Sequence, residues 1–127
     1  MHLPTRLFDV IAHQQAHYSK QDMLAAKEQG AWKTYSTNAV AALADRFSAG
    51  LLQAGVQAGD RIAIISFNRP EWIFTDLACQ QIGAVLVPIY PTISEPELEF
   101  VLSDSGSRML FVNNKDLYGK VHALRAK

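Results

Sequence analysis

Two polar residues stand where an anion could be held. Asn68 and Arg69 come shortly after the apolar run 62–65 and directly before Pro70, a residue suited to the first turn of a helix. Open α/β sheets bind anions between the carboxyl end of a strand and the start of a helix, because backbone N–H groups are free there. The guanidinium adds a planar set of donors. The pair is therefore a candidate anion site, but a capped turn that binds no ligand is the favoured interpretation, since no glycine-rich loop precedes the arginine.

A second candidate site follows the next apolar segment. Tyr90, Pro91 and Thr92 come directly after the segment 85–89, again at the carboxyl end of a predicted strand. Two readings stay open for these residues. They could border a ligand path, or they could form a rigid exit from the sheet, because proline fixes the backbone angle φ.

Other signals for chemistry are weaker. His13 and His17 stand four residues apart, a spacing that can place two imidazoles on one side of a metal ion. No glutamate follows His13 and no third ligand is near, so we assign both to an exposed polar helix face and predict no metal site. The chain has neither a glycine-rich phosphate loop ending in Lys and Ser or Thr nor a GxGxxG motif. The sequence predicts no catalytic residue.

The elements that position these residues form a βαβ crossover. Apolar runs predict strands over about 62–66 and 85–89, and the segment between them predicts a helix over 70–82. Glu71 complements the positive end of the helix dipole, and Gly83 is placed to end the helix. A right-handed crossover of this kind joins parallel neighbouring strands. We expect Trp72, Ile73, Leu77 and Ile82 to be mainly core, and Cys79 to be a small core residue.

A second crossover follows the first. Ser94 and Glu97 have the spacing of a capping box and predict a helix over 95–104, which Gly106 ends before a strand over 109–112. Before the first crossover the sequence predicts a helix over 5–17 capped by Thr5 and a β-hairpin of strands 23–27 and 31–35 joined by Glu28-Gln29-Gly30. A helix from Ser36 to Leu51, ended by Gly55, follows the hairpin. The last predicted element is a helix over 117–124, whose pattern still continues at Lys127.

These elements predict one fold class. Strands that are apolar along their whole length need cover on both faces, so helices should lie on either side of the sheet. The sequence predicts an α/β fold in three layers, with a mostly parallel sheet built from βαβ crossovers plus an N-terminal β-hairpin. No linker divides the chain, and we interpret residues 1–127 as a single unit.

Composition excludes several classes of protein. The 127 residues include 12 basic and 12 acidic side chains without a basic cluster, which argues against nucleic acid as a partner. A single cysteine cannot form an internal disulfide and fits a reducing compartment. The chain has no secretory signal pattern and no apolar run long enough for a membrane span. We therefore expect a cytoplasmic protein.

Several segments together resemble a known family. They are Gly59-Asp60-Arg61, Asn68-Arg69-Pro70-Glu71-Trp72, Gly83-Ala84 and Val87-Pro88-Ile89-Tyr90-Pro91-Thr92. They resemble the N-terminal part of AMP-forming acyl-CoA synthetases, members of the adenylate-forming superfamily, in register from about Thr34 to Val112. Asn-Arg-Pro-Glu-Trp and Pro-Ile-Tyr-Pro-Thr resemble the long-chain fatty acid branch more than the acetyl, aryl or amino acid branches.

The resemblance implies an activity for a longer parent protein. A long-chain fatty acid–CoA ligase converts fatty acid, ATP and CoA to acyl-CoA, AMP and pyrophosphate through an acyl-adenylate, with Mg²⁺, and could associate peripherally with a membrane. In this family the segment that corresponds to Tyr90, Pro91 and Thr92 borders the channel for CoA. An aryl or amino acid-adenylating enzyme is the alternative within the superfamily, and a non-catalytic α/β binding or interaction module is the alternative outside it.

The resemblance also sets expectations for the chain by itself. The family's phosphate loop, its acidic residue for the ribose and its catalytic lysine have no counterpart in these 127 residues. We therefore expect an N-terminal segment that is inactive alone and holds no cofactor tightly. A truncated sheet should expose apolar surface, so we also expect the segment to self-associate.

Overall fold

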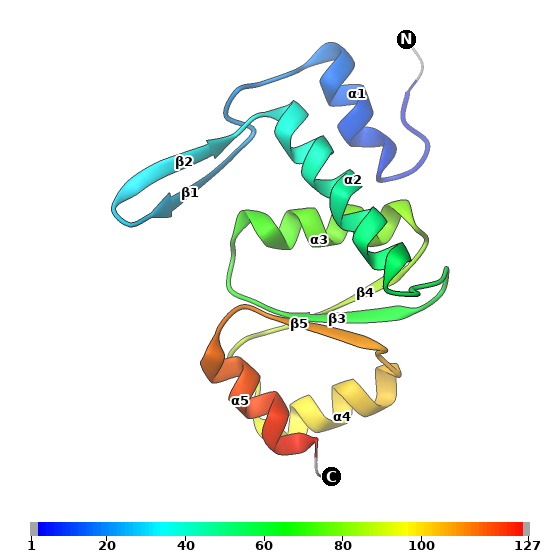
Figure 1. Ribbon diagram of the computed structural model, residues 1–127, viewed down its shortest axis with the longest axis vertical. Helices are drawn as coiled ribbons and strands as arrows, with labels where there is room; N and C mark the ends of the chain where they lie inside the picture. Colours follow the sequence, from blue (N-terminus) through cyan, green and yellow to red (C-terminus); the bar gives the residue numbers. More distant parts are fainter. Residues whose placement is uncertain (1–2, 126–127) are drawn as a thin grey trace.

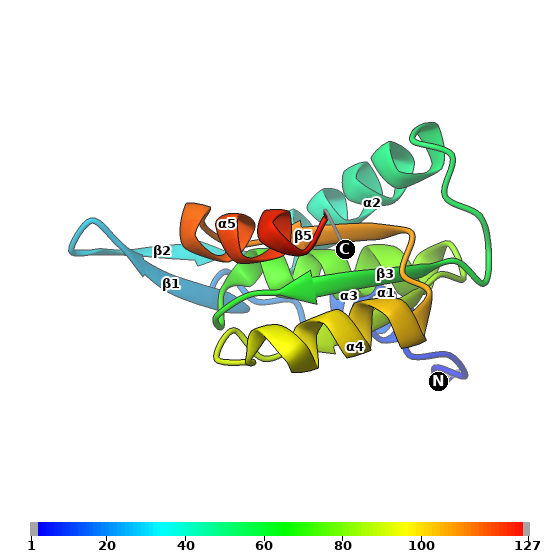
Figure 2. The same ribbon diagram turned by 90° about the horizontal axis from the view of Figure 1, so that it is seen from below.

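The computed structural model describes residues 3–125 and has three layers (Figure 1). In chain order its elements are α1 (Asp9–His17), β1 (Leu24–Glu28), β2 (Ala31–Tyr35), α2 (Thr37–Gln53), β3 (Arg61–Ile65), α3 (Pro70–Gln81), β4 (Val85–Ile89), α4 (Glu95–Ser105), β5 (Met109–Val112) and α5 (Lys115–Leu124). Helices α2 and α3 cover one face of the sheet, and α4 and α5 cover the other. Figure 2 shows α4 and α5 side by side, with the hairpin β1–β2 projecting beyond the body.

The main sheet is parallel, as the sequence predicted. Its strand order is β4-β3-β5, and β3 pairs with both neighbours in the parallel sense. Opposite faces of β3 carry separate cores: Ile62 packs with α2 and α3, whereas Ala63 and Ile65 pack with α4 and α5. Because β3 is buried on both faces, its sequence is apolar without alternation.

Local signals begin and end the crossover helices. Helix α3 starts at Pro70 and is followed by Gly83 in a left-handed conformation, with φ of 75°. In α4 the predicted capping box is present: the backbone N–H of Glu97 donates to the Ser94 hydroxyl, and the Glu97 carboxylate accepts from the Ser94 backbone N–H. These ends turn the chain so that each strand after β3 returns parallel to it.

Two N-terminal predictions need correction. Helix α1 begins at Asp9 rather than near Thr5, because the Asp9 carboxylate gathers donors from the Thr5 hydroxyl and from Arg6 and holds the preceding residues in a turn. The hairpin turn contains two residues rather than three, since Glu28 pairs with Ala31. Its central residues are Gln29 and Gly30, with φ of 50° and 82°. Positive φ at both positions is typical of the two-residue hairpin turn whose twist matches the right-handed twist of the flanking strands.

The buried face of α3 also differs from the prediction. Its buried residues are Pro70, Phe74, Thr75, Ala78 and Cys79, whereas the expected core residues Trp72, Ile73, Leu77 and Ile82 are half-buried. Of these four, Leu77 and Ile82 still pack against the hydrophobic core, as predicted. The helix lies between α2 and the sheet, so small side chains occupy the closest contacts. Burial raises the pKa of the Cys79 thiol to about 11, and Cys79 is a core residue as predicted.

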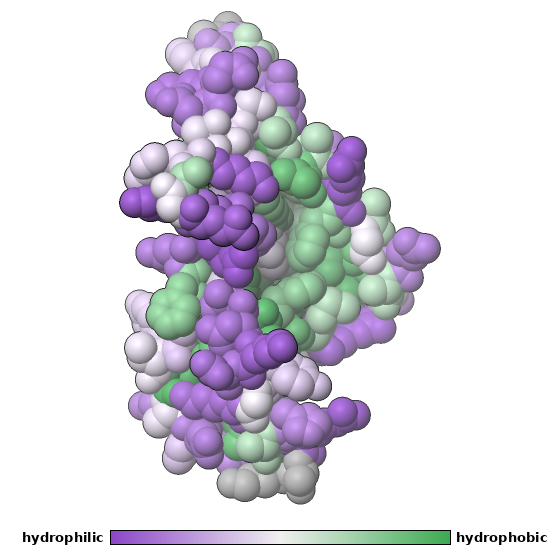
Figure 3. Space-filling model, turned by 60° about the vertical axis from the view of Figure 1, so that its left-hand side comes forward, coloured by the Kyte–Doolittle hydropathy of each residue, from purple (hydrophilic) through white to green (hydrophobic). Residues whose placement is uncertain are grey.

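Apolar surface is exposed on one side of the molecule. In the space-filling view of Figure 3, apolar side chains gather around a hollow near mid-height. Phe47 of α2 and Phe111 of β5 lie with ring centroids 5.3 Å apart and line a cleft of about 260 Å³ beside the edge of the sheet. Among residues 3–125, no helix has the length and apolar character required to cross a membrane.

Candidate ligand clefts at the carboxyl edge of the sheet

The strands of the parallel sheet end at a common edge, and the predicted site residues lie there. Asn68 follows β3, and Tyr90 and Pro91 follow β4. The structure brings these three residues together around one cleft of about 550 Å³, although Asn68 is more than twenty positions before Tyr90 and Pro91 in the chain. The full lining consists of Ser66, Phe67, Asn68, Trp72, Pro88, Ile89, Tyr90 and Pro91. We refer to it as the Asn68–Tyr90 cleft.

Asn113 holds the segment after β3 in place. The Asn113 backbone N–H donates to the carbonyl of Ile65 over 3.2 Å, and its side-chain oxygen accepts from the backbone N–H of Phe67 over 3.3 Å. The Ser66 hydroxyl donates to the carbonyl of Phe67 over 2.7 Å. Asn113 therefore joins the carboxyl ends of β5 and β3 and positions the residue before Asn68.

Arg69 is paired with a carboxylate of its own helix. Its Nε donates to Oε2 of Glu71 over 2.9 Å, and the two side chains are 41% and 47% exposed. This hydrogen bond is the main cause that raises the pKa of Arg69. Burial acts to raise the pKa of Glu71, but the hydrogen bond from Arg69 and other contacts outweigh burial and leave it lowered. An anion at Arg69 would therefore have to share the guanidinium with Glu71.

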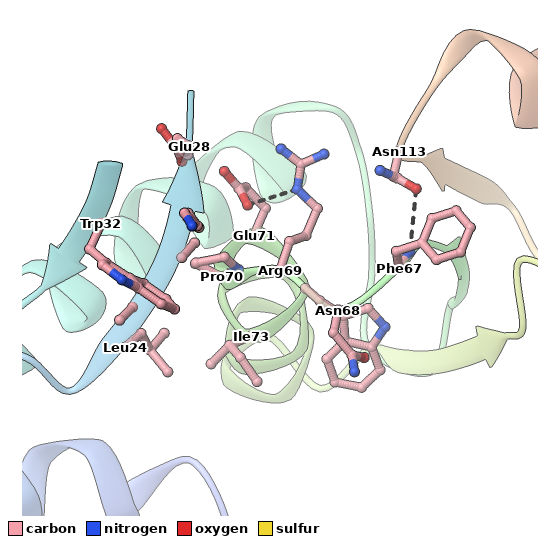
Figure 4. A pocket seen from close by; sticks show the side chains of 14 residues that line it. Leu24, Glu28, Trp32, Phe67, Asn68, Arg69, Pro70, Glu71, Ile73 and Asn113 are labelled. Atoms are coloured by element: carbon pink, nitrogen blue, oxygen red, sulfur yellow. Dashed lines mark hydrogen bonds and ion pairs between the residues drawn. The ribbon is translucent and has the colours of Figure 1, made fainter. Parts of the chain in front are cut away.

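A larger cleft separates the hairpin from the start of α3 (Figure 4). Its volume is about 570 Å³, and Asn68 and Arg69 both line it, with Leu24 and Trp32 among the hairpin residues opposite. In Figure 4 the Arg69 side chain turns toward Glu71, away from Asn68. The two residues of the candidate anion site thus share a cleft, but their side chains do not converge.

Thr92 lies beyond the Asn68–Tyr90 cleft. It lines a neighbouring cleft of about 600 Å³ together with Tyr90, Ile93, Pro96, Glu97, Phe100 and Val101. Tyr90 is 83% exposed and borders both clefts, so it connects them. The Lys120 ammonium of α5 donates to the carbonyl of Ile93 and holds the segment after β4 against α5.

The clefts offer hydrogen-bonding groups beside aromatic surface. An amide at Asn68, hydroxyls at Ser66 and Tyr90 and the rings of Phe67 and Trp72 suit a ligand with both polar and apolar parts. Within the described range 3–125, no group of three or more His, Cys, Asp and Glu side chains is arranged to hold a metal ion. Sequence reasoning missed the role of Asn113, although a polar residue after the third strand was a signal that could have pointed to it.

Known proteins with similar sequences include a CoA ligase and an acyl-CoA synthase. The long-chain-fatty-acid–CoA ligase FadD15 of Mycobacterium bovis is 45% identical over 83 residues, which are 60% of this chain and 14% of that protein. A feruloyl-CoA synthase of an Amycolatopsis species is 45% identical over 65 residues, which are 51% of this chain and 13% of that protein. The chain thus spans about one seventh of the length of these relatives.

Solved structures place the same fold in a larger domain. The crystal structure of the N-terminal domain of FACL13 from Mycobacterium tuberculosis, solved with an inhibitor, aligns with a TM-score of 0.81 and 29% identity. The alignment covers 97% of this chain and 30% of that domain. Residues 11–127 match the family of AMP-binding enzymes, which is nearly the whole chain. The chain therefore belongs to the AMP-binding enzyme family.

Proposed function

We propose that the chain is the N-terminal part of a long-chain fatty acid–CoA ligase that forms acyl-CoA, AMP and pyrophosphate from fatty acid, ATP and CoA. The observation that carries the proposal is the Asn68–Tyr90 cleft, which lies at the edge of a parallel sheet where α/β proteins bind ligands. Family membership and the likeness to FadD15 support the reaction. The lone buried Cys79 fits a cytoplasmic location for the parent protein.

In this proposal Tyr90, Pro91 and Thr92 border the path of CoA. The cleft residues suit the pantetheine arm of CoA, a chain of amides and methylenes, because Asn68 can hydrogen bond to an amide while the aromatic rings cover the methylenes. Pro91 fixes the backbone beside this path. Arg69 is the candidate contact for an anionic group, in competition with Glu71.

The residues of this chain do not fit the ATP phosphates or Mg²⁺. A triphosphate needs a phosphate loop, and Mg²⁺ needs carboxylates or phosphates arranged around it. Neither the sequence nor the described residues supply such a group. We therefore assign ATP and Mg²⁺ binding to other parts of the parent protein and expect the 127-residue chain to be inactive alone.

The test measures pyrophosphate release with palmitate, ATP and Mg²⁺. We expect release by the intact parent protein and none by the 127-residue chain at the same concentration. Activity of the 127-residue chain would contradict the assignment of the phosphate site to other parts. Failure of the parent protein to activate any fatty, aryl or amino acid would leave a non-catalytic α/β binding module as its function.

A second candidate is an aryl acid as the substrate. The feruloyl-CoA synthase favours this candidate, because it is as identical to this chain over its matched segment, 45%, as FadD15 is over its own. The measurement that separates the two candidates compares kcat/KM of the parent protein for palmitate and for ferulate. A higher value for ferulate would replace the fatty acid in the proposal but would keep the role of the CoA path.

We also propose that the 127-residue chain self-associates through the β5 side of the sheet. Within residues 3–125 the outer strands β4 and β5 each pair with β3 alone, so each has one edge that no described strand covers. Pro88 lacks an N–H and makes β4 a poorer partner for another strand, whereas β5 has no proline. Sedimentation velocity should show association that grows with concentration and weakens in Phe111→Lys. The matched control Phe100→Lys changes an exposed residue of α4 and should associate normally. A monomer at every concentration would contradict this proposal.

A further inference from the structure

Two imidazoles lie side by side on α1, outside the clefts described above. His13 and His17 are one helical turn apart, and their ring centroids are 4.6 Å from each other with the planes tilted by 48°. His17 is exposed and His13 is half-buried. Both rings line an open surface cleft of about 390 Å³, together with residues 3–6 and Asp9. The pair is therefore accessible to a small solute.

The separation of the rings matches that of two imidazoles bound to one metal ion. Metal–nitrogen bonds of 2.0–2.1 Å put the ion about 3.2 Å from each ring centroid, so the centroids are about 4.5 Å apart at right-angle coordination and about 5.2 Å apart at tetrahedral coordination. The observed 4.6 Å lies within this range. Rotation about the terminal side-chain bond of histidine is soft, so the nitrogens can turn toward a shared ion without moving the helix.

The neighbours of the pair determine the rest of the coordination. Asp9 lies one turn before His13, but both of its carboxylate oxygens accept from Arg6, over 3.0 Å and 2.8 Å. Asp9 is therefore already occupied, and water would complete the coordination shell. The ring of Tyr18 lies near both imidazoles, with centroids 5.9 Å and 6.2 Å away.

We propose that His13 and His17 form a surface site for one divalent transition-metal ion. Sequence reasoning predicted no metal site because it required a third protein ligand, whereas a site open to water needs only the two imidazoles. Imidazole nitrogen suits Cu²⁺, Ni²⁺ and Zn²⁺, and Cu²⁺ binds most tightly of the three. The site is separate from the clefts at the carboxyl edge, so metal binding requires no acyl or nucleotide ligand.

Calorimetric titration with CuCl₂ and with ZnCl₂ tests the site. All proteins carry His2→Ala, because a histidine beside the N-terminal amine is itself a copper chelate. We expect one Cu²⁺ per chain, bound more tightly than Zn²⁺ and released by EDTA. Either His13→Ala or His17→Ala should lower the Cu²⁺ affinity about tenfold or more, because the second imidazole binds within the same molecule.

Two controls separate spacing from the number of histidines. His122→Ala removes a histidine on α5 and should leave the affinity unchanged. His17→Ala combined with Ala12→His keeps the number of histidines but makes them adjacent, and neighbouring residues in a helix do not face each other. This double variant should bind as weakly as His17→Ala, and circular dichroism verifies its helix content. Absence of Cu²⁺ binding in the His2→Ala chain, or equal binding by both spacings, would overturn the proposal.

Discussion

The two edges of the parallel sheet use their polar groups differently. At the amino edge, formed by residues 54–61, 83–85 and 105–109, Arg108 donates to the carbonyl of Gly55 over 2.9 Å and to the Asp60 carboxylate over 2.8 Å. Arg61 donates to the carbonyl of Ser105, and the N–H of Gly59 donates to the carbonyl of Gly83 over 2.8 Å. The polar groups of this edge thus bind parts of the same chain.

The carboxyl edge is less completely occupied by its own chain. Asn113 ties down Phe67, but the side chains of Asn68 and Tyr90 point to open clefts. Arg69 pairs with Glu71 only two positions along the chain and ties no separate element to the edge. Arginines of similar exposure, 51% for Arg108 and 41% for Arg69, therefore have different roles. Arg108 ties the start of β5 to the segment 54–60 that precedes β3, whereas Arg69 lies beside a cleft.

The largest stability effect is expected from a glycine at the amino edge. Gly83→Ala should destabilise the chain by roughly 1–2 kcal/mol, because a side chain at positive φ is strained. The added Cβ would also lie 3.3 Å from the Cβ of Ala58. The same change at Gly119, in α5 with open space around it, should stabilise by about 0.5–1 kcal/mol. Urea denaturation measures both, and equal effects at the two glycines would contradict the tight packing of this edge.

Arg108→Ala gives a smaller effect that depends on pH. The pKa of Asp60 is lowered, first by the hydrogen bond from the Gln57 backbone and then by that from Arg108. Because the pKa of Asp60 is lower in the folded state than in the unfolded state, its ionised carboxylate stabilises the folded protein. This contribution is complete at pH values above the unfolded-state pKa of about 3.9 and disappears as pH falls through the folded-state pKa. The hydrogen bond from Arg108 to the carbonyl of Gly55 contributes about 1 kcal/mol to stability at any pH between 3 and 6.

The measurement compares urea midpoints of the original chain and of Arg108→Ala from pH 6 down to pH 3. The difference between them should be largest at pH 6 and should shrink toward pH 3 without vanishing. Arg46→Ala, at an exposed position of α2, is the control and should show a small difference that does not change with pH. A gap that widens on acidification would mean that Asp60 does not take part.

Local patterns were enough to predict the body of the fold. The apolar run of β3, the proline that starts α3 and the Ser94–Glu97 capping box act within a few residues, so the sequence displays them directly. The starting point of α1 was predicted wrongly because donors gathered on Asp9 compete with helical spacing. The face of α3 was predicted only in part: Leu77 and Ile82 pack against the core, but the buried Phe74 and Thr75 were missed. Which side chains of α3 are most deeply buried depends on how closely α2 and the sheet approach, which no local pattern records.

The candidate site was predictable only in part for the same reason. Asn68 and Tyr90 each follow a strand, so the rule for parallel sheets identified them separately. Their shared cleft depends on strand order, and the role of Asn113 depends on a hydrogen bond to a residue 46 positions away. The pairing of Arg69 with Glu71 depends on side-chain conformations at the start of α3 and was not predicted.

Asn113→Ala should loosen the carboxyl edge locally. Loss of the hydrogen bond from the Phe67 N–H should cost about 0.5–1.5 kcal/mol, and amide exchange at Phe67 should become faster. Asn114→Ala is a matched neighbour: its side chain accepts from the Leu117 N–H over 2.9 Å and caps α5, so faster exchange should appear in α5 instead. Hydrogen exchange monitored by NMR measures both, and identical patterns in the two variants would contradict the positioning role of Asn113.

The smallest effect on stability is expected at the tip of the carboxyl edge. Tyr90 is 83% exposed, so Tyr90→Ala should change the free energy of unfolding by no more than about 0.5 kcal/mol. In the parent protein the same change should raise KM for CoA, because the ring borders both clefts on the proposed CoA path. Pyrophosphate release from fatty acid and ATP, measured without CoA, should be unchanged. Tyr118→Ala, at an exposed position of α5, should alter neither quantity. A KM for CoA that stays constant in Tyr90→Ala would remove Tyr90 from the CoA path and leave the segment after β4 as a rigid exit from the sheet.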